Sequence, residues 1–424
     1  LVPGLGKLAI AGKIEAYNFP QGVICQLLRD IAAGRPGCIT HVGLGTFIDP
    51  ANGGGRLNDS TTDELVSRLE LDGKAWLFYR AFPIHVGLIR ATAADPFGNL
   101  VMDEEAVIGE VLPIAQAAHN CGGKVIAQVK RLLARPALPS QVKVPGILVD
   151  HIVVAEDAEH PQTFSEALNR SYFSARSSVE VPGEIESENM AAGVRRIIAA
   201  RACDELLPGA IANLGIGIPE GVGLIAAERQ MLDQITLTVE SGPIGGIPAG
   251  GLSFGASAWP EAIIDQPAQF DFYDGGGLDY AALGAAQVDQ YGNVNVSKFG
   301  DRIAGVGGFV NISQNARRVV FCGTLTSGGL EVEIVDGKLR IVKEGSIRKF
   351  VNHVEQVSFS GEVAAESGRE ILYVTERAVF QLTPQGLCLT EVAPGIDIQT
   401  QILNLIDFSP VVENVRPMKA SCFD

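Results

Sequence analysis

The segment AIANLGIGIPEGVGLIAAE (residues 210–228), followed by ITLTVESG (235–242), contains a strand, a glycine turn, a helix and a second strand in close succession. The apolar run at 210–214 predicts the first strand, and Pro219 suits the first turn of the helix that follows. The β-branched run at 235–239 predicts the next strand. Because a strand, a helix and another strand in this order form a βαβ unit, the sequence predicts an α/β fold.

Further elements extend this pattern in both directions from the βαβ unit. Residues 21–34 place apolar side chains on one helical face and stop at a glycine, which predicts an amphipathic helix. Strands are predicted at 38–42, 125–129 and 147–155. The last is apolar enough for a strand that is covered on both faces. Another helix is expected near 189–206.

The chain of 424 residues is too long for one core of usual size, so at least two domains are expected. Residues 156–188 are polar, rich in Ser and Glu, and contain Pro161 and Pro182, which predicts a linker. The predicted division is therefore an N-terminal domain at 1–155, the linker, and a C-terminal domain at 189–424.

A weak internal repeat supports two similarly folded halves. ADPFGNLVM (94–102) resembles VDQYGNVNV (288–296), and a predicted strand follows each Gly-Asn pair at the same distance, beginning at Val125 and Val319. Strand ends at 42–43 and 239–240 precede the repeated glycines by similar distances.

The C-terminal part reads as antiparallel. EVEIVDGKLRIV (331–342) is two alternating runs around Asp336-Gly337, which is a type I′ hairpin signal. Residues 371–382 and 386–392 form a further antiparallel pair in this interpretation. The second domain is therefore expected to hold a mixed sheet.

Composition excludes several classes of protein. The formal net charge is −16 and no basic stretch occurs, so neither nucleic acid nor an anionic membrane is an expected partner. No run of eighteen apolar residues exists, and the first residues lack the features of a signal peptide, although the true N-terminus can lie upstream. Seven scattered cysteines without a CxxC pair indicate reduced thiols in a soluble cytoplasmic protein.

Most of the sequence motifs for known chemistry fail in their context. Glycine turns at 43–45, 215–217 and 305–307 lack the third glycine of a dinucleotide fingerprint, no GxxxxGK[ST] occurs, and the six histidines show no metal-ligand spacing. A GxSxG match lies at 251–255, but no strand precedes its Ser253 and Trp259-Pro260 interrupts the expected helix. We interpret it as an ordinary turn, and no metal is expected.

Glu240 remains as a candidate. It follows the strand 235–239, and open α/β sheets bind ligands beyond the carboxyl ends of their strands. Five glycines follow it within eleven residues. Without Cβ atoms, they let a ligand approach the main chain closely. A solvated side chain is the alternative for a lone glutamate in such a turn.

Four segments together resemble the family I coenzyme A transferases, most closely the single-chain acetate or propionate CoA-transferases: VESGPIGG (239–246), QFDFYDGGGLD (269–279), GNVNVSKFG (292–300) and CGTLTSGG (322–329). The resemblance extends over nearly the whole chain, from KIEAYNFPQGV (13–23) to EVAPGID (391–397). It implies two open α/β domains of the CoA-transferase type, with an added antiparallel β region in the second. Family members normally begin several tens of residues earlier, so the first domain is expected to lack its first strand and helix.

The resemblance also implies the site. Glu240 corresponds to the family's nucleophile, and Gln21 corresponds to the glutamine that stabilises the oxyanion. Positions implied to contact substrate or CoA are Gly22, Gly275, Gly276, Gly277, Asn295, Gly307 and Gly308. For Asn295 and for the turn at 307–308, a purely connecting role is the alternative.

The implied activity is CoA transfer between a short-chain acyl-CoA and a free carboxylic acid, by a ping-pong mechanism through a glutamyl-CoA thioester. Coenzyme A is then a substrate and part of a covalent intermediate, with no permanently bound cofactor. A homodimer or homotetramer is implied. The alternatives are an acyl-CoA hydrolase, a sugar-phosphate isomerase on a similar fold, and a catalytically silent component of an oligomer.

Overall fold

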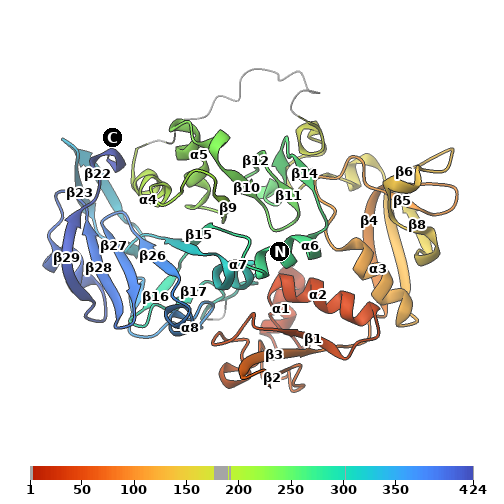
Figure 1. Ribbon diagram of the computed structural model, residues 1–424, viewed down its shortest axis with the longest axis horizontal. Coiled ribbons are helices and arrows are strands. Elements are labelled where there is room, and N and C mark those ends of the chain that lie inside the picture. Colours follow the sequence, from red (N-terminus) through yellow and green to blue (C-terminus); the bar gives the residue numbers. More distant parts are fainter. Residues whose placement is uncertain (1–2, 176–189, 191, 301, 424) are drawn as a thin grey trace.

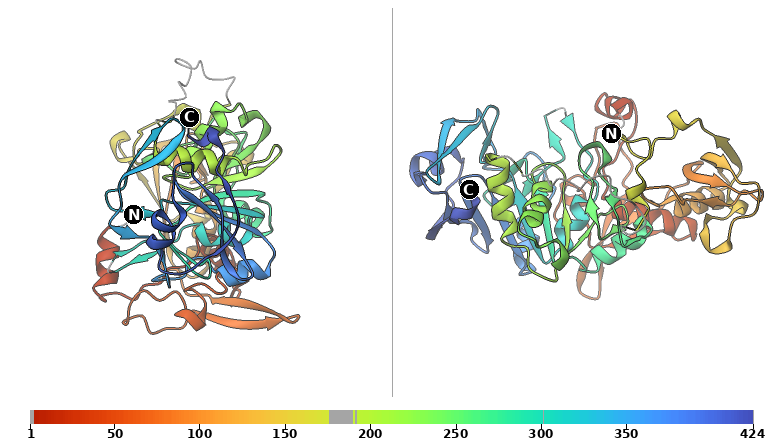
Figure 2. Two further views of the ribbon diagram at one scale, coloured as in Figure 1. Left: turned by 90° about the vertical axis from the view of Figure 1, so that its left-hand side faces the viewer. Right: turned by 90° about the horizontal axis from the view of Figure 1, so that it is seen from above.

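The computed structural model describes residues 3–175, 190, 192–300 and 302–423, and it has an elongated shape (Figure 1). The right-hand view of Figure 2 shows that the strands between residues 86 and 154 and the C-terminal strands lie at opposite ends of the molecule. The elements of the first half are α1 (Pro3–Ile10), α2 (Gln21–Ala32), β1 (Gly37–Thr40), β2 (Val66–Leu71), β3 (Lys74–Arg80), β4 (Val86–Ala94), β5 (Leu100–Val101), α3 (Val111–Asn120), β6 (Lys124–Leu132), β7 (Val142–Val144) and β8 (His151–Val154).

The first half contains two sheets. The larger has the order β7-β5-β4-β6-β8, in which β4, β6 and β8 are parallel, and α3 packs on one face of it. The smaller is the antiparallel sheet β1-β3-β2, which packs with α2. Val306 and Val310 from the second half belong to the same apolar cluster as α2, so this cluster joins the two halves.

Two sequence predictions for the first half are wrong. The strand predicted at 147–155 forms as β8, but it is not covered on both faces: Ile152, Val153 and Val154 are exposed, and β8 lies at the edge of its sheet, where it pairs only with β6 in the part of the chain that the structure describes. The strand that ends near Val42 is β1, and it belongs to the antiparallel sheet. It is therefore no counterpart of the strand that precedes Glu240.

The second half begins with α4 (Val194–Cys203), β9 (Ile211–Leu214), α5 (Glu220–Glu228), β10 (Thr236–Thr238), β11 (Pro243–Ile244), β12 (Ile247–Pro248), β13 (Ser257–Ala258), β14 (Ala262–Ile263), α6 (Gln266–Asp274), β15 (Tyr280–Gly284), β16 (Gln287–Asp289), β17 (Val294–Asn295), β18 (Lys298–Phe299) and β19 (Arg302–Ile303). It continues with α7 (Phe309–Asn315), β20 (Arg318–Cys322), β21 (Thr326–Ser327), β22 (Glu331–Val335), β23 (Lys338–Lys343), β24 (Ile347–Arg348), β25 (Phe350–Val351), α8 (Gly361–Glu366), β26 (Glu370–Val374), β27 (Ala378–Thr383), β28 (Gly386–Val392), α9 (Ile398–Gln401) and β29 (Val411–Pro417).

A mixed sheet of ten strands organises the second half, in the order β14-β11-β10-β9-β15-β20-β26-β27-β28-β29. Its centre, from β10 to β26, is parallel, and the strands on both sides of this centre pair antiparallel except for β28 and β29, which are parallel. Helices α4 and α5 pack on one face, while α6 and α7 pack on the other. The predicted βαβ unit, mixed sheet and hairpin are confirmed, the hairpin turning at Asp336 and Gly337 with positive φ.

The repeated Gly-Asn segment has the same local structure in both halves. Asp95 accepts hydrogen bonds from the main-chain N–H and the side-chain amide of Asn99, and Asp289 does the same with Asn293. The turn glycines, Gly98 and Gly292, have φ of 79° and 78°. Strands β6 and β20 follow at the predicted places, which supports two similarly folded halves.

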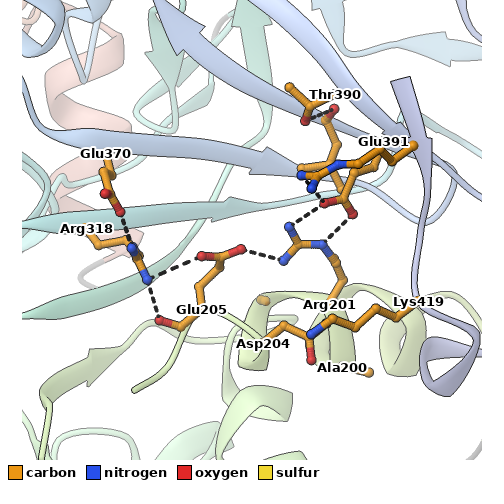
Figure 3. Close-up of polar contacts among 12 residues, drawn as sticks. Ala200, Arg201, Asp204, Glu205, Arg318, Glu370, Thr390, Glu391 and Lys419 are labelled. Carbon is orange, nitrogen blue, oxygen red and sulfur yellow. Dashed lines mark hydrogen bonds and ion pairs between the residues drawn. The ribbon is translucent and has the colours of Figure 1, made fainter. Parts of the chain in front are cut away.

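Ion pairs hold α4 against the ten-stranded sheet (Figure 3). Arg201 of α4 pairs with Glu391 of β28 and with Glu205, at 2.7 and 2.8 Å. Glu205 also pairs with Arg318, the first residue of β20, which in turn pairs with Glu370, the first residue of β26. This network therefore runs across the face of the sheet that α4 covers, from the first residues of β20 and β26 to Glu391 near the carboxyl end of β28.

The part of the predicted linker that the structure describes, up to residue 175, packs on the second half. Glu166 accepts hydrogen bonds from Ser253 and Tyr172, both at 2.5 Å. Ser253 lies in a short 3₁₀ turn, and neither a strand before it nor a helix after it is present there, so the GxSxG match is a turn, as predicted. The remainder of the predicted linker falls largely outside the described residues, and the domain boundaries stay a prediction.

Candidate active site

Glu240 lies just beyond the carboxyl end of β10, in the tight turn that leads to β11. The turn is closed by the hydrogen bond from Gly242 N–H to Val239 O, at 3.0 Å. Gly242 has a φ of 124°, and a Cβ atom there would lie 2.0 Å from Ile264 O, so only glycine fits. The turn therefore holds Glu240 at the carboxyl end of β10, directly after the strand.

The Glu240 carboxylate is partly buried, and burial raises its pKa above the usual range of a glutamate. Asn213 opposes this effect, because its Nδ2 donates a hydrogen bond to Glu240 Oε2 at 3.3 Å. The same amide also donates to Thr238 O at 3.2 Å. Asn213 is buried near the end of β9, the strand next to β10, so neighbouring strands supply the carboxylate and its donor.

Gln21 comes from the other half of the chain. It is the first residue of α2, and its main-chain N–H donates to Gly307 O at 2.8 Å. Its side-chain Oε1 lies 3.7 Å from the position that a Cβ atom would take on Gly307. On Gly308 such an atom would lie 3.3 Å from Glu240 Cγ. The turn at 307–308 therefore lies between Gln21 and Glu240, and four of the predicted site residues come together.

Gly22 lies in the same first turn of α2, but its contacts are internal. Its N–H donates to Asn311 Oδ1 at 3.2 Å. A Cβ atom would lie 2.5 Å from Asn311 Nδ2 and 2.6 Å from the Phe270 ring. Gly22 is therefore the position at which α2 packs closely on α6 and α7, and its N–H is engaged within the protein.

Four other predicted residues lie elsewhere in the second half. Asn295 is buried in β17, and its side-chain Nδ2 donates to Gln287 and to Lys298 O, both at 2.7 Å. Gly275, Gly276 and Gly277 form the turn after α6. The contacts among described residues do not join these four to Glu240 or Gln21, and their role as CoA contacts stays a prediction.

The sequence interpretation missed Asn213, Asn311 and Asp274. A weak signal existed for Asn213, which is the polar residue in the otherwise apolar strand IANL. For the other two, the sequence offered none, because their importance depends on contacts with α2, which lies more than 200 residues away in the chain.

In the described residues, no group of three or more His, Cys, Asp and Glu side chains is placed to hold a metal ion. Among the same residues, no helix has the length and apolar character needed to cross a membrane. All seven cysteines are free thiols, and six of them are buried.

A partly buried carboxylate, amide donors and a glycine turn lie together at the carboxyl end of β10, and comparisons with known proteins give the class of enzyme. Residues 3–155 match the family described as coenzyme A transferase. Acetate CoA-transferase YdiF of Escherichia coli (strain K12) is 44% identical over 411 residues, which cover 97% of this chain and 76% of YdiF. The chain therefore belongs to the coenzyme A transferase family and is a CoA-transferase enzyme.

Two further proteins are similar to this chain over nearly its whole length. Caffeate CoA-transferase of Acetobacterium woodii is 46% identical over 431 residues, covering 99% of this chain and 80% of that protein. The crystal structure of acyl-CoA transferase YdiF from E. coli O157:H7, a thioester complex with CoA, matches with a TM-score of 0.91 and 42% identity. That match covers 100% of this chain and 79% of the other, and it confirms the predicted CoA-transferase fold.

Proposed function

We propose that this enzyme transfers CoA between a short-chain acyl-CoA and a free short-chain carboxylate, with Glu240 as the nucleophile. The observation that carries the proposal is the position of Glu240, partly buried at the carboxyl end of β10 and separated from Gln21 only by the turn at 307–308. The relatives named for acetate and for acyl-CoA transfer, one of them solved as a CoA thioester, support it.

The reaction proceeds in two half-reactions. The Glu240 carboxylate attacks the acyl-CoA carbonyl, the C–S bond breaks, and a mixed anhydride and CoA thiolate form. The thiolate then attacks the glutamyl carbonyl, which gives a glutamyl-CoA thioester and releases the first acid as a carboxylate. The acceptor carboxylate repeats these steps in reverse, so no net proton is taken up and the enzyme returns to its starting state.

Side-chain amides are the donors that this site offers to the tetrahedral oxyanions. The main-chain N–H groups of Gln21 and Gly22 are already bonded to Gly307 O and Asn311 Oδ1. The amides of Gln21 and Asn213 are therefore the candidate donors, each able to stabilise the transition state by about 3 to 4 kcal/mol when well placed. Partial burial of Glu240 also keeps water from the anhydride.

Mass spectrometry of the protein after incubation with acetyl-CoA alone tests the proposal. We expect a CoA adduct on the peptide that contains Glu240, sensitive to hydroxylamine and absent from Glu240→Gln. Exchange in Glu240→Ala should fall by at least about 10³-fold, because the nucleophile is lost, while the protein stays folded. A smaller fall in Glu240→Ala would contradict the assignment of Glu240 as the nucleophile. Release of CoA that does not require acetate would instead indicate a hydrolase.

We also propose the finer points that the sequence predicted. The family resemblance implies CoA contacts at Gly275–Gly277 and Asn295, a division into domains at 155 and 189, and a homodimer or homotetramer. A cytoplasmic location agrees with the seven free thiols. Size-exclusion chromatography with light scattering tests the oligomeric state.

A further inference from the structure

The first turn of α2, which carries Gln21, is capped by the other half of the molecule. Pro20 stands at its N-cap position and no side chain of this segment caps the helix. Gln21 N–H donates instead to Gly307 O, and Gly22 N–H donates to Asn311 Oδ1. Because the first amides of a helix lack partners within the helix, these two bonds decide how its first turn sits.

Asn311 can cap α2 only in one orientation of its side-chain amide. It is fully buried on α7, and its Nδ2 donates to both carboxyl oxygens of Asp274, at 2.9 and 3.0 Å. An amide has a donor end and an acceptor end. A carboxylate on one side therefore requires Nδ2 there, which leaves Oδ1 to face Gly22 N–H.

We propose that Asp274 is a positioning residue for the transfer reaction: through Asn311 it fixes the first turn of α2 and so places Gln21 opposite Glu240. Asp274 lies at the end of α6, and α6 packs directly on both α2 and α7. Asn315 supports the same arrangement, because its Nδ2 donates to Asp274 Oδ1 at 3.2 Å and its Oδ1 lies 2.6 Å from His41 Nε2. The inference rests on the proposed role of Glu240 and Gln21.

The protonation state of Asp274 should matter to this arrangement. Burial and, to a smaller extent, the nearby Asp271 together raise the pKa of Asp274 to about 7, although hydrogen bonds from the amides of Asn311 and Asn315 lower it. A protonated Asp274 has an O–H that can donate to Asn311 Oδ1, which turns the amide so that Nδ2 meets Gly22 N–H. Other titratable groups that interact with Asp274 or its partners are Cys25 of α2, Cys38 of β1, Tyr79 of β3, His41 and, paired with Asp271, Arg29.

Asp274→Asn tests the proposal, with Asp271→Asn as the matched control. Asp271 lies on the same helix and also contacts α2, through Gln26 and Arg29, but it is exposed and makes no hydrogen bond to Asn311 among the described contacts. Because Asp271 also raises the pKa of Asp274, Asp271→Asn should move the titration of Asp274 to lower pH without abolishing it. We expect kcat of Asp274→Asn to fall about tenfold to hundredfold, with KM for acetyl-CoA within about twofold. The step near pH 7 that Asp274 adds to the acid limb of the wild-type kcat profile should also be lost, while the part set by Glu240 remains. A kcat and pH profile like those of Asp271→Asn would overturn the proposal.

A double-mutant cycle tests whether Asp274 acts through Asn311. Because the two residues form one unit, Asn311→Ala and the double variant Asp274→Asn/Asn311→Ala should have the same kcat. Losses that multiply would show an independent role and would overturn the proposal. A further test uses the wild-type protein alone, so it does not depend on whether a variant folds. It measures amide hydrogen exchange of the peptide around Gly22, corrected for intrinsic rates. Its protection should fall as the pH drops through about 7, and constant protection would contradict the inference.

The same preparations separate this inference from the proposed function. If the wild-type enzyme transfers CoA without an adduct on Glu240, the proposed nucleophile is wrong. If the wild-type adduct forms and Asp274→Asn forms it at the same rate, the nucleophile stands and the positioning role of Asp274 is wrong.

Discussion

Two opposing influences set the pKa of Glu240, and Asn213 controls one of them. Burial raises the pKa, and the hydrogen bond from Asn213 lowers it. Asn213→Ala should therefore raise this pKa further. Because attack requires the ionised carboxylate, the acid limb of kcat/KM should move to higher pH, and the maximum rate should fall about tenfold or more with the loss of a donor.

The kcat/KM profile of Asn213→Ala measures this shift, and Tyr273→Phe is its control. Tyr273 OH lies 2.8 Å from Thr238 Oγ1 and accepts from Asn213, but no bond from it reaches Glu240 in the described contacts. Its removal should leave the acid limb in place. An acid limb that stays unmoved in Asn213→Ala would mean that Asn213 does not hold the carboxylate.

At this scale, the sequence offered the candidate nucleophile but not most of the residues that surround it. Glu240 followed from a strand end with a glycine turn and from the family resemblance, and Gln21 followed from the resemblance alone. Asn213, Asn311 and Asp274 could not be predicted, because each acts through contacts between segments far apart in the chain. Gly22 was predicted as a substrate contact, whereas its N–H bonds to Asn311.

The turn before α7 offers a direct test of space at the site. A Cβ atom on Gly308 would lie 3.3 Å from Glu240 Cγ, 3.2 Å from Phe270 Cζ and 3.3 Å from Ile312 Cδ1, and φ of Gly308 is −81°, which any residue adopts. Gly308→Ala should therefore displace the Glu240 side chain without straining the backbone. We expect activity to fall about tenfold to hundredfold while the melting temperature changes little.

Gly305→Ala is the matched control, since it lies in the same turn and a Cβ atom there meets nothing within 4 Å. It should retain wild-type activity. Equal effects of the two substitutions on initial rates would show that the turn, and not the space beside Glu240, matters.

The ion-pair network on α4 lies on the face of the sheet that α4 covers, whereas the turn beside Glu240 leads into α7 on the other face, so the network should affect stability alone. Arg201 is buried and pairs with Glu391 and Glu205 (Figure 3). Arg201→Ala should cost about 3 to 5 kcal/mol, because it leaves buried carboxylates without their partner. We expect a lower melting temperature and an unchanged kcat at permissive temperature.

The exposed pair of Arg340 and Glu333 in the β22–β23 hairpin is the control for that substitution. Its removal by Arg340→Ala should cost less than about 1 kcal/mol. If kcat falls in Arg201→Ala, the ion-pair network on α4 influences the active site as well as stability.

Local elements were predictable wherever the sequence pattern itself is local. The hairpin at Asp336-Gly337 and the βαβ unit form as predicted, because turn chemistry and periodicity decide them. β1 and β8 were placed wrongly for the opposite reason. Which strand lies beside another, and whether a face is covered, depends on the rest of the sheet.

At the scale of the whole molecule, the site exists only where the two halves meet. Gln21 comes from the first half, while Glu240 and the turn at 307–308 come from the second. The apolar cluster that joins α2 to Val306 and Val310 holds this arrangement. The distance between Gln21 and Glu240 therefore depends on how the two halves pack together. A buried charge between the halves should influence both the activity and the stability.

Asp274 is that charge, and its effect on stability has a definite sign. Its pKa in the folded protein is about 7, against an ordinary value of 3.8. The folded state therefore binds this proton more tightly, so its contribution to the free energy of unfolding is greatest below about pH 4. The contribution declines as the pH rises to about 7, where it levels off. At about 1.4 kcal/mol per pKa unit, the decline is on the order of 4 kcal/mol.

Asp274→Asn has no proton to lose, so the comparison with wild type isolates this effect. The melting temperature of the variant, relative to wild type, should rise steadily between about pH 4 and about pH 7 and stay constant above that range. Calorimetry of both proteins across this range measures the difference, and all other titrating groups cancel in it. If the melting temperatures of the two proteins change in parallel with pH, Asp274 is ionised in the folded protein even at low pH. The enzyme would then hold a permanent negative charge between its halves, and Asn311 would keep one orientation at every pH at which the protein folds.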